Sequence, residues 1–417
     1  MERFKAYSRS TFASLSIYNY RLYFIGQGIS LTGTWIQTIA QTWLIFTLTH
    51  SGTYIGLLTA VQFLPVLLLG PAGGLVADRF PKRRIIYVTQ TVSMLLALVM
   101  AALVLSHTVQ PWMVFVLAGL LGLVQVVDTP TRQTFIMEMA GRDNLTNAVT
   151  LNSVEVNMAR IIGPAIAGGL IAGIGIGYCF LANGLSYIAV LFCLLLMRGH
   201  ELHADATIAR AKGQLREGFR YVQRTPVLRN ILLMMAVIGT FSYEFPVLLP
   251  IYAGNTFHHG AGGYSLLMGA MGLGAVIGGV ISANRRKPSP AAITLAASAF
   301  GVAMLLAAIA PDIWVAAALM VLVGIGSISF TALASSTLQL QTAPEMRGRV
   351  MALWTVAFIG STPIGGPIIG YVSEHASARL GFLIGGVAAL GSGLFAIYIA
   401  RRVRLRQPIE PQLPAAG

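Results

Sequence analysis

Three charged residues lie inside long apolar stretches of the sequence: Glu155, Arg160 and Glu244. A charged side chain at the centre of a bilayer costs roughly 2.5–3.5 kcal/mol on insertion scales, so each is a candidate functional residue. Glu155 and Arg160 are about 140° apart around a helix, so they are not expected to pair with each other. Each acid is a candidate for proton exchange. The alternative for each is a structural ion pair with another helix.

Polar residues form a stripe along one face of the first apolar stretch, at steps of three and four residues: Gln27, Ser30, Thr34, Gln37 and Gln41. Polar groups that face lipid have no hydrogen-bond partners, so the stripe is expected to face the protein interior. It lines a water-filled pathway or holds helices together, and we favour the pathway. A second stripe carries Thr150, Ser153, Asn157 and Arg160.

The elements that must position these residues are membrane helices. Of the 417 residues, 56% are hydrophobic and only 10% are charged, and this composition excludes a soluble globular domain of this length. The sequence predicts twelve spans of about 20 residues or more. Their ranges are 21–47, 53–77, 85–106, 111–133, 146–172, 175–197, 228–253, 263–284, 291–309, 313–339, 348–373 and 377–400.

The polar segment between the sixth and seventh spans divides the chain into two halves. We expect a bundle at 1–197, a cytoplasmic linker at 198–227, a second bundle at 228–400 and a cytoplasmic tail at 401–417. The linker includes an amphipathic stretch, 213–224, that is typical of a helix lying on the inner leaflet or of a solvated linker helix. The halves also repeat one another. Gly163-Pro164 in the fifth span, a predicted helix bend, is echoed by Gly366-Pro367 in the eleventh.

Basic residues concentrate in alternate loops. This placement predicts an orientation with both termini in the cytoplasm. The net charge of +14 is therefore attributed to these loops and not to binding of nucleic acid. The only cysteines, Cys179 and Cys193, lie within one apolar stretch and predict neither a metal site nor a cofactor. No phosphate-binding loop or nucleophile with a base is present, so an enzyme or a receptor is disfavoured.

A glycine-rich helix end is followed by an acid and basic residues between the second and third spans. Gly74, Asp78, Arg79, Lys82 and Arg83 resemble the signature loop of the major facilitator superfamily, with Pro81 in place of its second glycine. The stretches 128–135, 145–168, 245–250 and 347–354 resemble the bacterial secretion-effector branch, which includes enterobactin-exporter-like transporters. The resemblance covers nearly the whole chain.

This resemblance implies an all-α membrane protein whose twelve transmembrane helices form two pseudo-symmetric six-helix bundles. It implies a monomeric secondary transporter of the bacterial inner membrane that works by alternating access. We expect a proton-coupled efflux carrier for a small amphiphilic molecule, such as a drug or a siderophore; a nutrient importer of the same fold is the alternative.

The resemblance also assigns roles to two acids. Asp78 is expected to meet the beginning of the eleventh span near Gly348, where a carboxylate is stabilised by the positive end of the helix dipole. Asp128 is expected to belong to the same gate, as a partner of Arg79 or Arg83.

Overall fold

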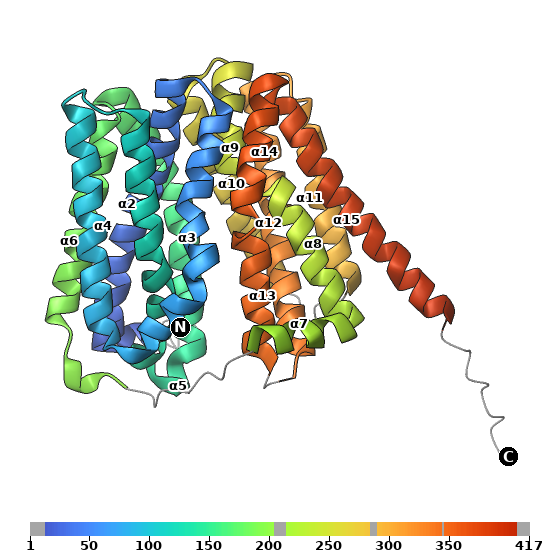
Figure 1. The fold of residues 1–417 in the computed structure, drawn as a ribbon, viewed down its shortest axis with the longest axis horizontal. Coiled ribbons are helices and arrows are strands. Elements are labelled where there is room, and N and C mark those ends of the chain that lie inside the picture. The colour runs from blue at the N-terminus through green and yellow to red at the C-terminus, as the bar shows by residue number, and fades with distance from the viewer. Residues whose placement is uncertain (1–12, 204–213, 284–289, 344–345, 407–417) are drawn as a thin grey trace, which may run out of the picture.

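The computed structural model describes residues 13–203, 214–283, 290–343 and 346–406, and every regular element in these ranges is helical. The helices form two bundles that lie side by side (Figure 1). The first bundle contains η1 (Ala13–Ser16), α2 (Tyr18–Thr49), α3 (Gly52–Arg79), α4 (Lys82–Leu105), α5 (Pro111–Gly173) and α6 (Gly177–Leu196).

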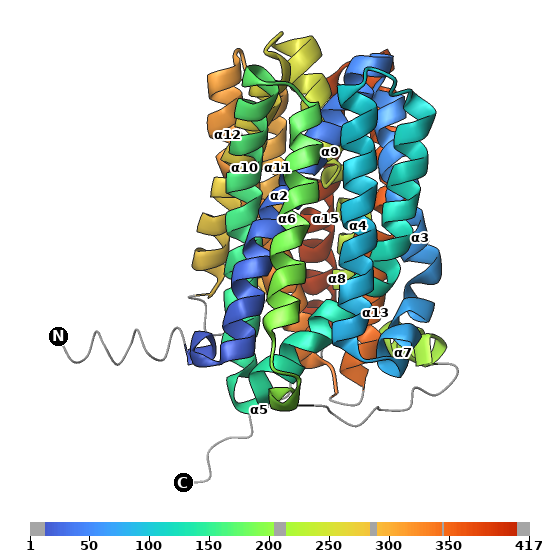
Figure 2. The same cartoon turned by 90° about the vertical axis from the view of Figure 1, so that its left-hand side faces the viewer.

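The second bundle follows a short turn, η2 (Gly199–Glu201), and a linker helix, α7 (Gln214–Arg224). Its elements are α8 (Pro226–Ser242), α9 (Phe245–Ile251), η3 (Tyr252–Thr256), α10 (Gly260–Ala283), α11 (Pro290–Ala308), α12 (Ile313–Gln341), α13 (Arg347–Ile359), α14 (Thr362–His375) and α15 (Ala378–Arg406). Figure 2 views the molecule from the side of the first bundle.

Eleven helical segments of the described chain are long and apolar enough to cross a membrane. The helix α2 is not among them, although its 32 residues are ample for a span. Its polar stripe lowers its hydropathy, and most of that stripe is buried. With α2 included, the described residues contain the twelve predicted crossings, and the chain is a multi-pass membrane protein.

The fourth and fifth spans are joined differently from the prediction. A loop was expected at 134–145, but helix α5 runs from Pro111 to Gly173 with a single non-helical residue, Gly141 (φ 68°, ψ 172°). Glycine adopts a positive φ without the steric penalty of a Cβ, so one residue suffices to turn the chain between two helices. The helical backbone continues through Pro164, and a bend at Gly163-Pro164 stays a prediction.

Two other spans are interrupted in the middle. The seventh span breaks at Tyr243 and Glu244, between α8 and α9, and the eleventh breaks at Gly360 and Ser361, between α13 and α14. A proline occupies the first turn of the helix after each break, Pro246 in α9 and Pro363 in α14. Proline lacks an N–H and suits the start of a helix. In the eleventh span the interruption therefore precedes Gly366-Pro367, which lie inside α14.

The two ends of the bundles differ in charge. We call the end that carries Lys82, Arg83, Arg198 and Arg347 the basic end, and the opposite end, with Ser51 and Glu374, the far end. The linker helix α7 lies at the basic end, beside α13 (Figure 1). Its Glu217 forms an ion pair with Arg349 of α13 (2.7 Å). Its Val222 is buried while Phe219 is exposed, so α7 is docked on the second bundle rather than fully solvated.

Candidate functional site

The basic residues of the loop between α3 and α4 contact their own bundle. Lys82 forms an ion pair with Glu138 of α5, and Arg83 donates a hydrogen bond to the carbonyl oxygen of Leu195 at the end of α6 (3.2 Å). Gly74 is buried and Arg79 is exposed. The side chain of Asp78 lies outside the part of the chain that the structure describes, so its contact with the eleventh span stays a prediction. A Cβ on Gly348 would meet no atom within 4 Å.

Asp128 does not have the partner that was expected. One oxygen, Oδ2, pairs with Nε of Arg132 one helical turn along α5 (2.8 Å). The other, Oδ1, accepts hydrogen bonds from Thr89 (2.6 Å) and Gln90 (3.0 Å) of α4. The pairing with Arg79 or Arg83 is therefore wrong. Basic residues are abundant at the basic end of the bundle. Only the packing of the helices shows which of them contacts Asp128.

Replacing Arg132 with leucine is expected to lower the free energy of unfolding by about 3–5 kcal/mol, because Asp128 would remain as a buried charge without its cation. Thermal unfolding of the purified protein in one detergent measures the loss. The matched control is Glu201→Gln, which breaks the exposed Arg198–Glu201 pair (3.0 Å) and should change stability by less than about 1 kcal/mol. Equal effects from the two variants would contradict the role given to Asp128.

Part of the polar stripe on α2 holds the first bundle together. Gln37 accepts a hydrogen bond from Asn183 of α6 (2.6 Å), and Gln41 donates one to Gln62 of α3 (3.4 Å). For these two residues the structure supports the packing alternative rather than the pathway. Thr34 bonds to the backbone of its own helix, whereas Oε1 of Gln27 is buried without a hydrogen-bond partner. A pathway role stays a prediction for Gln27 and Thr34.

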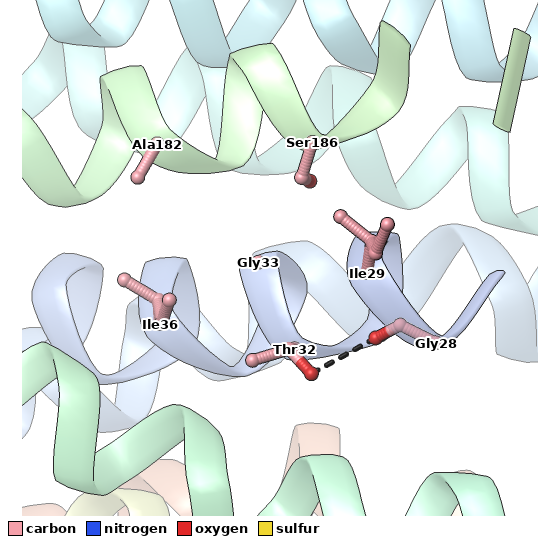
Figure 3. Close-up of a pocket in the computed structure, with 7 residues that line it drawn as sticks. All are labelled: Gly28, Ile29, Thr32, Gly33, Ile36, Ala182 and Ser186. Carbon is pink, nitrogen blue, oxygen red and sulfur yellow. Dashed lines mark hydrogen bonds between the residues drawn. The ribbon is translucent and has the colours of Figure 1, made fainter. Parts of the chain in front are cut away.

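A groove of about 440 Å³ runs between α2 and α6 on the other side of this stripe. Figure 3 shows its lining: Gly28, Ile29, Thr32, Gly33, Ile36, Ala182 and Ser186. Only two side chains there are polar, and Thr32 is already bonded to the carbonyl oxygen of Gly28 (2.9 Å). Ile29 is half exposed and borders the groove. The groove therefore suits an apolar chain better than a polar substrate.

Glu155 is buried in the first bundle, with 6% of its surface exposed. Its Oε1 has no hydrogen-bond partner and lies against Gly28 of α2, 2.9 Å from the position of a Cβ on that glycine. Arg132 is the cation that acts on it electrostatically. As predicted, Glu155 does not pair with Arg160. Asn157 bonds to the backbone carbonyl of Ser153 (2.8 Å).

Glu244 occupies the break in the seventh span and is 2% exposed. Its backbone carbonyl oxygen accepts hydrogen bonds from the N–H groups of Val247 and Leu248 in the first turn of α9. Its carboxylate lies beside Thr362 of α14, and neither carboxylate oxygen has a well-formed hydrogen bond. The two oxygens are 2.9 and 3.4 Å from the positions of a Cβ on Gly365 and Gly366, respectively. This acid therefore contacts the eleventh span directly, and it does so without a cation.

Arg160 is half buried near the middle of the fifth span, in the part of α5 that follows Gly141. Its guanidinium lies over the ring of Trp35 of α2, 5.3 Å from the centroid, and its Nε is buried without a hydrogen-bond partner. Tyr243, beside Glu244 at the break, interacts with it electrostatically. Side chains from both bundles thus meet at this level of the molecule.

The two bundles contact each other closely at the far end, through α3 and α14. A Cβ on Gly56 would overlap the carbonyl oxygen of Gly366, and Gly52 and Gly370 face each other in the same way. Small residues allow such close approach of helices. The contact is mainly a backbone seam, and the side chain of Ile251 in α9 also packs against Gly52.

A carboxylate closes this seam. Oε2 of Glu374, at the end of α14, accepts hydrogen bonds from the Ser51 hydroxyl (2.6 Å) and from the Thr53 backbone N–H (2.9 Å) and hydroxyl (2.5 Å) at the beginning of α3. An acid at the positive end of a helix is favourable. We call this contact the far-end latch. Glu374 was not predicted as a site residue. The available sequence signal was an acid at the end of the eleventh span, together with the serine, Ser51, that precedes the second span in the other half.

Within the described residues, no three His, Cys, Asp or Glu side chains lie together in a way that could hold a metal ion.

The fold defines the class of the molecule. It is similar to a crystal structure of the nucleoside transporter NupG, with a TM-score of 0.70 and 14% identity, over 92% of this chain and 99% of that one. At this identity the likeness shows the fold alone, which is the major facilitator fold. The predicted fold class is confirmed.

The family model for transmembrane secretion effectors matches residues 9–412, and the chain belongs to this family. The assignment confirms the predicted resemblance and a transporter rather than an enzyme. Among curated relatives, the staphyloferrin A transporter of Staphylococcus aureus is 29% identical over 63% of this chain and 65% of its own length, so the match spans just under two thirds of that protein. The enterobactin exporter EntS of Salmonella typhi is 24% identical over 94% of this chain and 95% of its own length.

Proposed function

We propose that the chain is a proton-coupled exporter of a small amphiphilic molecule of the drug or siderophore type, working by alternating access in the bacterial inner membrane. The basic end then faces the cytoplasm, as the loop charges predict, and both termini lie on that side. The names of the two relatives support the substrate type, and one of them is an exporter.

The far-end seam is the observation that carries the proposal. Its glycines bring backbone against backbone, and its latch consists of hydrogen bonds to one carboxylate, which can be exchanged for water. The latch can therefore open by hydration. Opening the far end also separates apolar contacts between the bundles, such as the stacking of Trp43 of α2 on Tyr264 of α10. With the far end closed, substrate enters from the basic end, which is the side from which an exporter must load.

Two buried acids supply the coupling in this mechanism, Glu155 in the first bundle and Glu244 in the second. Both carboxylates are buried and have oxygens without hydrogen-bond partners, which is unfavourable for the charged form. Each is therefore expected to take up a proton when water is excluded and to release it when water enters. Glu244 lies behind Gly366, and therefore next to the seam that must open. Its protonation is thus the step most directly linked to the far end.

Everted membrane vesicles test the proposal, because their outer surface is the cytoplasmic face. Vesicles containing the chain should accumulate enterobactin, staphyloferrin A or a lipophilic dye when a proton gradient is imposed, and a protonophore should abolish the accumulation. Vesicles without the chain are the control.

Accumulation that persists in the presence of the protonophore would contradict the proposed proton coupling. Uptake of the same substrates by intact cells, without accumulation by everted vesicles, would contradict export and indicate import.

A further inference from the structure

Arg160 is a membrane-embedded cation that has no anionic partner among the described residues. Its electrostatic neighbour is the phenol of Tyr243, and no carboxylate acts on it. Neither of the two buried acids pairs with it: Arg132 is the cation that acts on Glu155, and Glu244 lies beside Thr362. An arginine in a membrane interior ordinarily has an anionic or carbonyl partner. Arg160 is therefore available to bind an anion.

The surroundings of Arg160 are aromatic and come from both bundles. Trp35 of α2 lies under the guanidinium, and Tyr243 stands at the break of the seventh span. The ring of Tyr243 contacts Phe358 of α13 edge-on, with 5.3 Å between centroids. All four side chains are half buried, so none is sealed inside its own bundle.

Tyr243 is held in place by α12. Its hydroxyl donates to the carbonyl oxygen of Ser327 (2.7 Å) and shares a hydrogen bond with Thr331 (2.7 Å). These hydrogen bonds fix the position of the ring close to Arg160. Close packing supports Trp35 as well, since Gly163 of α5 lies against its Cβ.

From these observations we infer that Arg160 is the anion-binding residue of the substrate site, and that the substrate is an organic anion with a planar apolar body. The guanidinium binds a carboxylate or an ionised phenol of the substrate, and Trp35, Tyr243 and Phe358 contact its apolar part. This inference rests on the proposed transport function and narrows it, because cationic amphiphiles are excluded as preferred substrates.

Binding to a matched set of probes tests the site without requiring transport. The full chain in lipid nanodiscs is titrated with 2-naphthoate, 2-naphthylmethanol and 2-naphthylmethylammonium, which share one ring system and differ in charge. Wild type should bind the anion at least about tenfold more tightly than the cation. Equal or reversed affinities would overturn the inference, whatever any variant does.

Variants then assign the preference to one residue. Arg160→Gln should weaken binding of 2-naphthoate by about tenfold and leave the neutral probe unchanged, while Arg160→Lys keeps part of the preference. The control is Arg220→Gln, on the exposed face of α7, which should bind as wild type does. Unchanged anion binding by a folded Arg160→Gln protein would contradict the assignment. Anion binding without proton-driven export would instead contradict the proposed function and leave the site intact.

Discussion

Gly56→Leu is expected to stop transport while both bundles remain folded. The new side chain would overlap the backbone of Gly366 and Pro367, which cannot move away as a flexible side chain could. Overpacking costs about 1–3 kcal/mol, and here the cost falls only on the state whose far end is closed. The equilibrium between the two states should shift roughly 5- to 150-fold toward the state that is open at the far end. Substrate transport in everted vesicles measures the loss.

The matched control is Gly391→Leu in α15. Gly391 is an exposed helical glycine, and a Cβ there would meet no atom within 4 Å. This variant should transport as wild type does. A melting temperature of Gly56→Leu close to that of wild type would show that the bundles are intact. Normal transport by Gly56→Leu would mean that the α3–α14 seam does not close during the cycle.

Glu244→Gln should reduce proton-driven accumulation of substrate at least about tenfold. Exchange of labelled for unlabelled substrate should be preserved. The amide has the shape of the acid but cannot carry a proton, so only the steps that require proton uptake or release should fail. Thermal stability should be unchanged or higher, because a buried carboxylate without a hydrogen-bond partner is removed. Parallel measurements of accumulation and exchange in proteoliposomes separate the two effects.

Glu155→Gln and Glu138→Gln complete this comparison. Glu155→Gln shows whether the acid of the first bundle is also required for coupling. Glu138→Gln breaks the ion pair with Lys82 and should reduce stability without uncoupling transport. Loss of both exchange and stability in Glu244→Gln would identify Glu244 as a structural residue and contradict its role in proton exchange.

The far-end latch and the signature loop lie at opposite ends of the molecule. The latch makes contacts between the bundles, and the described basic residues of the loop make contacts within the first bundle. The latch joins α3 to α14 across the two bundles. Lys82 and Arg83 of the signature loop join α4 to α5 and α6 within one bundle. The far-end latch is therefore an inter-bundle contact that lies outside the family motif. The bundles also meet where Gly272 of α10 lies against the backbone of Arg160 in α5.

Hydropathy along the chain accounts for eleven of the twelve predicted spans, and the length of the polar-striped first span accounts for the twelfth. Burial in lipid depends on the sum of side-chain transfer free energies over about 20 consecutive residues, and that sum is a local property of the sequence. The placement of Arg160, Glu155 and Glu244 inside the membrane follows from the same sum. So does the separation of Glu155 from Arg160, because helical periodicity fixes the angle between them.

Interactions between distant residues could not be obtained in this way. Ser51 and Glu374 are 323 positions apart in the sequence. Asp128 has several basic residues as candidate partners by sequence, and among the described residues it forms an ion pair with Arg132. The helix breaks at Glu244 and Gly360 also went unpredicted, because a proline in an apolar stretch is compatible with both a bend and a new helix start. Local properties of the chain therefore predict a membrane protein of two related halves and identify its buried polar residues. Which of these residues pair, which lack partners and where the halves touch depend on how separate helices pack, and this packing is visible only in the folded molecule.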